Sequence, residues 1–431
     1  MRTRVLEVIQ APAPDLLAGG EINRPAAGDE HPDWTLDIRG WAVGRDEAVT
    51  AVEGVHDGSV LWQVPLLIDR PGVAARFPRQ TSGDTVGFLA LQSLLGLPPS
   101  HEIEVRAVTE AGSRASIGSI VAERAPLRTS FEPRRQPIMI TTFGRTGSML
   151  LMRLLSSHPE ILSYKPHRFE QRIVSYWIDA LLTLSSPVSF LRGVAPQAGV
   201  EDAMWWIGTG APMPWPLRDE EVQEWLGGEA VEALATVSQQ RIDALYERIA
   251  ATTGDGDTQL FAEKSNLRVS SVAAELYPHG RELFLVRDFR DMVCSVFAFN
   301  EKRGVTGFGR AKADSDMQYV ERLGGWAASL AGAWERRRDR AHLVRYEDLV
   351  LEPERALAGV LEYVGVDAAT ETIQGMLDRL REDVPELREH PTSASAQSSI
   401  GRWRTDLDPE LTAACERAFG PILEVFGYER A

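Results

Sequence analysis

The chain has 431 residues, of which 44 % are hydrophobic, so it is long enough to form two domains with buried cores. Its formal net charge of −16 argues against a general binder of nucleic acids or anionic membranes, because such proteins need a basic surface. Any anionic ligand must therefore be bound by a local group of cations, and we expect no nucleic-acid partner.

Cysteines and apolar runs set further limits. Cys294 and Cys415 lie far apart and fit neither a disulfide framework nor a zinc-binding spacing, so we predict buried free thiols and no metal site. The longest apolar stretch, residues 180–194, is interrupted by polar residues and a proline, and the first residues lack an apolar signal core. We therefore expect a soluble cytoplasmic protein without a transmembrane segment. A homo-oligomer is compatible with the sequence.

Short segments of alternating polarity, separated by Gly, Asp, Pro and Ser, run from residue 34 to residue 121. This spacing is typical of a small antiparallel β-sandwich, which we place at residues 1–125. Its segment around Phe88 could be a strand or a helical turn. The composition resembles accessory modules attached to bacterial carbohydrate-modifying enzymes, and a packing or dimerisation module is the alternative.

A polar, proline-containing linker, residues 126–136, separates this domain from residues 137–431, where strand and helix patterns alternate. The apolar runs IMITTF, QLFAE, ELFLVR and HLVRY predict buried strands between long helices. The predicted fold class is therefore α/β, with a parallel sheet flanked by helices and ligands at the carboxyl ends of its strands. The Pro- and Trp-rich segment 205–219 is expected to form a loop or lid over the site.

The stretch PIMITTFGRTGSMLLMRLLSSHPE, residues 137–160, has the pattern of a strand, a turn with two glycines and a helix. Such a turn aims backbone N–H groups and a helix N-terminus at one anion. Arg145 adds a cation, and Thr146 and Ser148 add hydroxyl groups. The Gly-Lys-Ser/Thr ending of a nucleoside-triphosphate loop is absent, so we expect a different phosphorylated ligand. A plain strand-to-helix turn is the structural alternative.

A second motif, LFLVRDFRDMVCSV, covers residues 283–296. Arg287 stands at the end of a predicted strand and Ser295 lies in the helix that follows, so both can converge on one phosphate. Alternatively, the arginines and aspartates of this segment pair among themselves in a structural turn.

Taken together, the two motifs resemble the signature of sulfotransferases that use 3′-phosphoadenosine-5′-phosphosulfate (PAPS), a family with a P-loop-like α/β fold. FGRTGSM is similar to the family's 5′-phosphosulfate loop, with Met149 in place of its usual threonine. VRDFRDMVCS looks like the 3′-phosphate motif, and FAEKSN resembles a turn whose lysine, here Lys264, faces the sulfuryl group. YEDL, residues 346–349, and SSIGRWRTDL match later family segments. The resemblance implies these donor-binding residues: Gly144, Arg145, Thr146, Gly147, Ser148, Met149, Arg287, Ser295, Ser399 and Arg402.

The resemblance also implies a reaction, sulfuryl transfer from PAPS as co-substrate without a metal. Arg145, Lys264 and the loop N–H groups would stabilise the leaving 5′-phosphate. The segment ILSYKPHRFEQR offers two candidates for the base that takes the acceptor's proton. His167 is one, because the unperturbed pKa of a histidine suits proton transfer near neutrality, and Glu170 is the alternative. Each could instead be a surface residue without a catalytic role.

The acceptor is the least determined part of the prediction. We expect a hydroxyl group on a carbohydrate or glycosylated small molecule, with a lipid or natural product next and protein tyrosine last. Trp205, Trp206, Trp215 and the Gly-rich loop 303–310 could line the acceptor cleft or could be core packing. The alternative functions are a P-loop kinase or NTPase and a non-catalytic nucleotide-binding scaffold.

Overall fold

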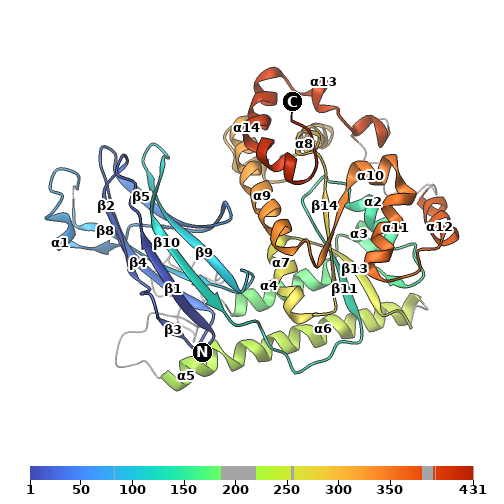
Figure 1. Cartoon of the computed structure of the whole chain (residues 1–431), viewed down its shortest axis with the longest axis horizontal. Coiled ribbons are helices and arrows are strands. Elements are labelled where there is room, and N and C mark those ends of the chain that lie inside the picture. The colour runs from blue at the N-terminus through green and yellow to red at the C-terminus, as the bar shows by residue number, and fades with distance from the viewer. Residues whose placement is uncertain (82, 186–219, 254–256, 381–391, 394, 431) are drawn as a thin grey trace. The chain divides into compact units, whose positions relative to one another are not determined.

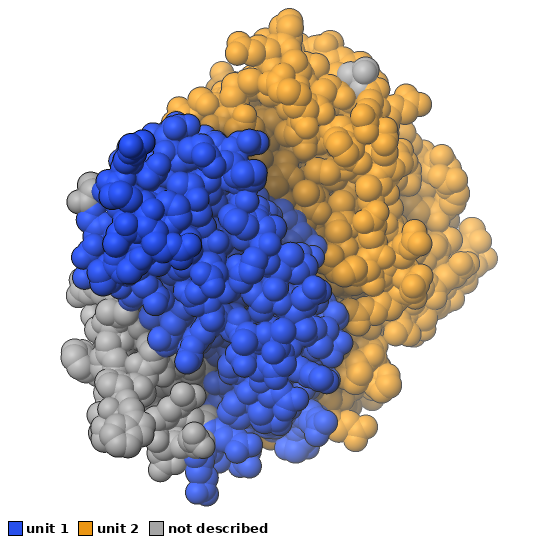
Figure 2. All heavy atoms as spheres, turned by 60° about the vertical axis from the view of Figure 1, so that its left-hand side comes forward, with its two compact units in different colours: residues 1–131, 177–238 blue, residues 132–176, 239–431 orange. Residues whose placement is uncertain are grey.

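The computed structural model describes residues 1–81, 83–185, 220–253, 257–380, 392–393 and 395–430 (Figure 1). The chain divides into two compact units, coloured separately in Figure 2. The first comprises residues 1–131 and 177–238, and the second comprises residues 132–176 and 239–431. The sequence-derived boundaries at residues 125 and 137 stay a prediction. Trp205, Trp206, Trp215 and the predicted lid at 205–219 lie outside the described residues.

The first unit contains two antiparallel sheets. One has the strand order β3-β1-β10-β9-β5-β6 and the other the order β2-β4-β8-β7. The bounds of its elements are β1 Thr3–Gln10, β2 Leu17–Arg24, β3 Glu30–His31, β4 Thr35–Gly44, β5 Val49–His56, β6 Ser59–Pro65, β7 Ile68–Asp69, α1 Pro71–Ala74, β8 Thr85–Ser93, β9 Ser100–Thr109, β10 Arg114–Arg124 and α5 Glu220–Gly227.

Local sequence explains these strands. β9 alternates in burial, with Ile103, Val105 and Ala107 directed to the interior. The turn between β5 and β6 has positive φ angles at Asp57 and Gly58, as a two-residue hairpin turn of type I′ requires. The segment around Phe88, which the sequence left open, is the strand β8.

The second unit is built on a parallel sheet with the strand order β12-β13-β11-β14-β15. Its strands are β11 Gln136–Thr142, β12 Ile161–Leu162, β13 Leu260–Ser265, β14 Arg281–Val286 and β15 Ala341–Arg345. The four apolar runs of the sequence correspond to β11, β13, β14 and β15. The predicted fold class, a parallel sheet flanked by helices and preceded by antiparallel strands, is confirmed.

Helices connect the parallel strands and continue after them. Their bounds are α2 Ser148–Leu155, α3 Pro166–Phe169, α4 Ile173–Leu184, α6 Glu229–Thr253, α7 Leu267–Leu276, α8 Phe289–Arg303, α9 Asp316–Arg337, α10 Tyr346–Leu351, α11 Pro353–Val364, α12 Thr370–Leu380, α13 Trp403–Asp406 and α14 Pro409–Val425. Short 3₁₀ turns lie at Arg310–Lys312 and Gln397–Ser399. Several helices begin at a side-chain cap; Asp288, for example, accepts from the Arg290 N–H at the start of α8.

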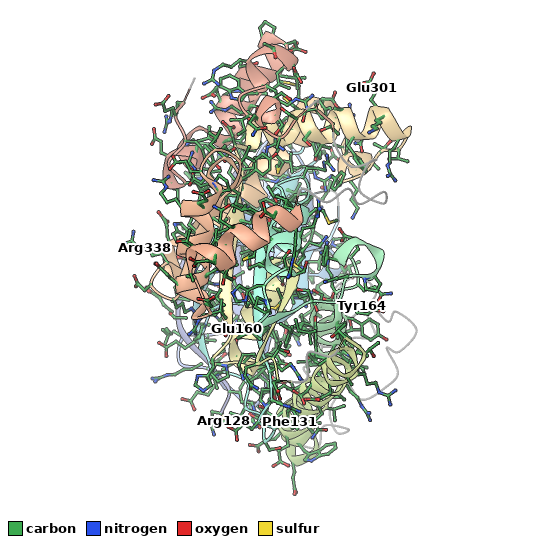
Figure 3. The ribbon with its side chains drawn as sticks, turned by 90° about the vertical axis from the view of Figure 1, so that its right-hand side faces the viewer. Arg128, Phe131, Glu160, Tyr164, Glu301 and Arg338 are labelled. Atoms are coloured by element: carbon green, nitrogen blue, oxygen red, sulfur yellow. The ribbon has the colours of Figure 1, made fainter. Side chains whose placement is uncertain are left out.

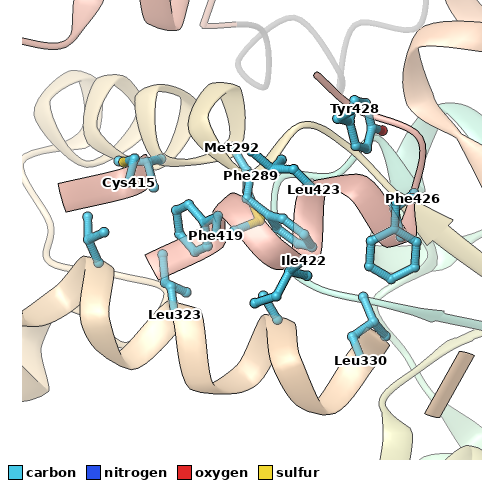
Figure 4. Close-up of a cluster of buried hydrophobic side chains, with 14 of the residues drawn as sticks. Phe289, Met292, Leu323, Leu330, Cys415, Phe419, Ile422, Leu423, Phe426 and Tyr428 are labelled. Atoms are coloured by element: carbon cyan, nitrogen blue, oxygen red, sulfur yellow. The ribbon is translucent and has the colours of Figure 1, made fainter. Parts of the chain in front are cut away.

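Hydrophobic clusters cover both faces of the parallel sheet. One cluster joins α8, α9 and α14 around Phe289, whose ring lies 5.4 Å from Phe419 and 6.0 Å from Phe426, centroid to centroid (Figure 4). A second cluster joins α2, α11 and α12 to the strands. Charged residues of the same helical segments, such as Glu301 of α8 and Arg338 after α9, are exposed to solvent instead (Figure 3). The apolar contacts therefore fix the sheet from which the site is built.

Both cysteines are free and buried, as the sequence predicts, and burial raises the pKa of each thiol to about 12. Within the described ranges, no group of three or more His, Cys, Asp or Glu residues is arranged to hold a metal ion. None of the helices in the described part of the chain has the length and apolar character needed to cross a bilayer.

Candidate functional site

A cavity of about 700 Å³ opens where β11, β13 and β14 end at their carboxyl edge. This is the edge at which parallel α/β sheets bind ligands. Most of the residues that the sequence singles out line it, namely Gly144, Arg145, Gly147, Ser148, Met149, Glu170, Lys264, Arg287, Ser295 and Ser399. The FGRTGSM loop lies more than a hundred residues before FAEKSN and VRDFRDMVCS, and the three motifs meet here because β11 lies between β13 and β14 in the sheet.

The loop between β11 and α2 needs its two glycines. Gly147 has φ +93°, and a Cβ there would lie 2.3 Å from Cδ2 of Tyr346. A Cβ on Gly144 would lie 2.4 Å from Cδ1 of Phe308. Arg145, between them, is itself in the left-handed region with φ +69°. The backbone of the loop is thus packed directly against two aromatic rings, and Ser148 begins α2 with its N-terminus at the cavity.

Arg145 links the loop to the second motif. Its Nε donates to Oγ of Ser295 at 3.1 Å, and its guanidinium lies over the Phe299 ring at 4.7 Å from the centroid. Burial, together with the nearby charge of Arg287, lowers the Arg145 pKa to about 10, so the side chain stays cationic near neutrality. Two motifs 150 residues apart in sequence are therefore joined by one hydrogen bond.

Arg287 is 4 % exposed and lies over the ring of Tyr346 at 4.6 Å. Its Nη2 donates to the Ser399 carbonyl at 2.5 Å, and its Nη1 donates to the Arg145 carbonyl at 3.4 Å. Its Nε–H is buried and has no acceptor among the described residues. A buried donor without a partner costs free energy, and a bound anion would remove that cost. The site thus fits a phosphate group at this position.

Two of the predicted donor-binding residues, Thr146 and Arg402, direct their side chains to protein groups. The Thr146 side chain is fully buried and its hydroxyl donates to the Phe143 carbonyl at 2.9 Å. Arg402 pairs with Asp406 at 2.6 Å and donates to the Thr392 carbonyl at 3.1 Å. It lines a smaller pocket that shares Thr392 with the main cavity. Neither side chain lines the main cavity itself.

Tyr346 is a site residue to which the sequence assigned no role. Its hydroxyl bonds Oγ of Ser399 at 3.0 Å, and Ser399 in turn donates to the Ala396 carbonyl at 2.6 Å. Because the Ser399 proton is used for that bond, Tyr346 is the donor of the pair. The signal in the sequence was its place directly after a strand, since it opens α10 at the carboxyl end of β15.

Lys264 and Glu170 form an ion pair inside the cavity, and the other Glu170 oxygen accepts from Arg172 at 3.0 Å. Burial lowers the pKa of Lys264, which is 2 % exposed, against the raising effect of Glu170. Burial alone would raise the pKa of Glu170, but hydrogen bonds from Lys264 and Arg172 hold it below its ordinary value. The His167 side chain lies outside the part of the chain that the structure describes.

Glu263 supports the segment that carries Glu170. Its carboxylate accepts from the backbone N–H groups of Val174 and Ser175, at 3.0 and 3.1 Å, and from the Tyr246 hydroxyl at 3.0 Å. These bonds satisfy two N–H groups at the start of α4. Complete burial raises the pKa of Glu263 to about 7 in spite of them. The residue before Lys264 therefore anchors the chain a few residues after Glu170.

Comparison with known proteins gives one family. The model of the family described as "Sulfotransferase family" matches residues 137–371, more than half of the chain. A curated relative, the protein-tyrosine sulfotransferase of Drosophila melanogaster, is 33 % identical over 104 residues. That match covers 23 % of this chain and 19 % of the relative, so the chain spans about a fifth of the relative's length.

Solved structures resemble the chain more distantly. The sulfotransferase domain of the Synechococcus PCC 7002 olefin synthase has a TM-score of 0.39 and 16 % identity, and covers 71 % of this chain and 100 % of that domain. Mouse sulfotransferase SULT7A1, complexed with PAP, has a TM-score of 0.37 and 12 % identity over 68 % of this chain and 86 % of its own. Sulfotransferase STF9 from Mycobacterium avium has a TM-score of 0.33 and 14 % identity, and the match covers 69 % of this chain and 79 % of that protein.

Proposed function

The chain belongs to the sulfotransferase family, and from this premise we propose that it transfers the sulfuryl group of PAPS to a hydroxyl group. The observation that carries the proposal is the cluster of Arg145, Arg287 and Ser295 at the cavity, with a buried Arg287 Nε–H that no described residue accepts. In a protein of net charge −16, this local concentration of cations is what an anionic donor would require.

The two arginines have different tasks in this proposal. Arg287 and Ser295 hold the 3′-phosphate, which distinguishes PAPS from ATP. Arg145, the N–H groups of the loop and the start of α2 hold the 5′-phosphosulfate and stabilise the charge that develops on the phosphate when the sulfuryl group leaves. Lys264 lies on the same cavity wall and neutralises the transferring group.

Glu170 is the proposed base, because it lines the cavity beside Lys264 and its depressed pKa keeps it ionised near neutrality. The attacking hydroxyl gives its proton to the Glu170 carboxylate, its oxygen forms the bond to sulfur, and the bond between sulfur and the phosphate oxygen breaks. His167, the other candidate from the sequence, remains the alternative base. For the acceptor we propose a carbohydrate or glycosylated small molecule.

The donor assignment is tested by thermal unfolding of the whole protein with adenosine 3′,5′-bisphosphate, ADP or ATP, each with and without magnesium. The bisphosphate should stabilise the protein without magnesium, and ADP should do so far less. Arg287→Lys should lose most of this preference because it removes the planar, multi-donor guanidinium. Stabilisation by Mg-ATP alone would contradict the proposal and favour a kinase.

Transfer itself is tested with radiolabelled PAPS and a panel of sugar, glycoside, phenol and lipid hydroxyls. Incorporation of label into any of them, lost in Lys264→Ala, supports the activity. Binding of the bisphosphate without transfer to any acceptor would point to a non-catalytic scaffold.

A further inference from the structure

The loop after α8 carries a phenylalanine in an unusual state. Phe308 lines the main cavity, is 39 % exposed and has φ +57°. A non-glycine residue in the left-handed region is strained, and such residues persist only where the surrounding structure holds them. An exposed aromatic ring held in a strained conformation at a cavity wall calls for an explanation beyond core packing.

Separate contacts hold the backbone and the ring of Phe308. Oδ1 of Asn300 accepts from the Gly307 N–H at 3.0 Å, and the Tyr319 hydroxyl donates to the Phe308 carbonyl at 3.2 Å. The ring meets Phe299 edge to face, with centroids 5.5 Å apart and planes at 74°. It also lies directly on Gly144 of the anion-binding loop, where a Cβ would be 2.4 Å away. The ring orientation is therefore set before any ligand arrives.

The neighbouring ring, that of Phe299, is covered by guanidinium groups, whereas none in the described part of the chain covers the Phe308 ring. Phe299 has the guanidinium of Arg145 at 4.7 Å and that of Arg303 at 5.1 Å from its centroid. Within the described residues, no arginine or lysine lies over Phe308 in this way. Phe308 is thus a preoriented, partly exposed apolar ring, next to the loop that binds the phosphosulfate in the proposed function.

We infer that Phe308 is a stacking residue for a ring with a flat apolar face in one of the two substrates. This inference rests on the proposed function, and it adds a specificity-determining residue to it. The ring comes from one of two sources, the adenine base of the donor or the sugar or aromatic ring that bears the acceptor hydroxyl. Both present the same chemistry to Phe308, an apolar ring face that packs on an aromatic side chain.

The test compares Phe308→Ala, Phe308→Leu and Phe308→Trp with the wild-type protein by calorimetry. The donor arm uses adenosine 3′,5′-bisphosphate and ribose 3,5-bisphosphate, which lacks the base. The acceptor arm uses 4-nitrophenyl β-glucoside, which carries both kinds of ring, added to protein saturated with the nucleotide. Val305→Ala is the matched control, because Val305 lies in the same loop and is 50 % exposed but does not line the cavity.

Removal of a stacking aromatic should weaken binding of one ring roughly tenfold. If adenine stacks on Phe308, the alanine variant binds the adenosine bisphosphate about tenfold more weakly and binds the ribose bisphosphate normally. If the acceptor stacks, only the glucoside is bound more weakly. Tryptophan should restore affinity in either case, leucine only in part, and Val305→Ala should change neither.

Unchanged affinity in both arms, with a melting temperature close to that of the wild type, would overturn the inference. The inference is also overturned if the glucoside binds to none of the proteins and the nucleotide binds Phe308→Ala as tightly as the wild type. Failure of the proposed function looks different, because the wild-type protein itself would then not bind the bisphosphate.

Discussion

The ammonium of Lys264 and the carboxylate of Glu170, 94 residues apart in the sequence, form an ion pair at the wall of the cavity. Lys264 is almost completely buried, whereas the Glu170 side chain is half exposed. In the absence of substrates the proposed base and the proposed cation therefore neutralise each other. In the proposed reaction an anionic donor competes with Glu170 for Lys264, and its binding frees the carboxylate to take a proton.

Glu170→Gln should lower kcat by about 10²–10⁴-fold, the usual contribution of a positioned base. Its affinity for adenosine 3′,5′-bisphosphate should stay near the wild-type value or rise, since Lys264 loses its competing partner. Steady-state kinetics with radiolabelled PAPS and calorimetry provide the two measurements. His167→Ala is the matched control. Near-normal turnover of Glu170→Gln combined with an inactive His167→Ala would transfer the role to the histidine.

The pH dependence separates the two bases without mutation. A base acts when deprotonated, so kcat/KM falls as the pH drops below the pKa of the free enzyme. The Glu170 pKa lies below its ordinary value of 4.5, since Lys264 and Arg172 bond the charged form. We expect a flat profile between pH 5 and pH 7. An acidic limb near about pH 6.5, the ordinary histidine value, would contradict the assignment.

Gly147→Ala should destabilise the protein and abolish binding of the bisphosphate. The substitution places a Cβ 2.3 Å from Tyr346 and forces a left-handed backbone on alanine. Gly365→Ala is the matched control, because Gly365 has φ +87° with no atom within 4 Å of its Cβ position. The control should lose about 1–2 kcal/mol from backbone strain alone. If urea unfolding shows that Gly147→Ala loses no more unfolding free energy than Gly365→Ala, the Tyr346 ring can move away from the added Cβ.

Glu263 should make stability depend on pH in an unusual direction. Burial raises its folded-state pKa from 4.5 to about 7, so the folded protein binds a proton that the unfolded chain has released. This contribution to the unfolding free energy is complete below pH 4.5 and is lost as the pH rises toward 7. The loss amounts to roughly 3 kcal/mol. Urea unfolding of the wild type and of Glu263→Gln from pH 4.5 to pH 7.5 measures it, and parallel pH profiles of the two proteins would refute it.

The sequence predicts the framework of the second unit well because its strands are continuous apolar runs. β11, β13, β14 and β15 all coincide with such runs. β12, with only two residues at the sheet edge, is too short for any periodic pattern. Parallel strands place their ends together, so the meeting of Arg145 with Ser295 also follows from the order of motifs.

Side-chain direction was beyond sequence reasoning. The motif identifies Thr146, but its hydroxyl turns to the Phe143 carbonyl because the tight loop brings that oxygen within reach. Arg402 has an acceptor four residues later on its own helical turn, Asp406, and the motif alone does not show that the two side chains pair. The contact of Phe308 with Gly144 joins two loops 164 residues apart, and only the folded chain brings them together.

The buried Nε–H of Arg287 affects the stability of the protein as well as the binding of its ligand. This donor has no protein acceptor among the described residues, and a buried donor without a partner reduces the free energy of unfolding. In the proposed function, binding of the nucleotide removes this cost and shifts the folding equilibrium by mass action. If the protein binds PAPS as proposed, we expect its resistance to proteases, and with it its abundance, to follow the supply of that nucleotide.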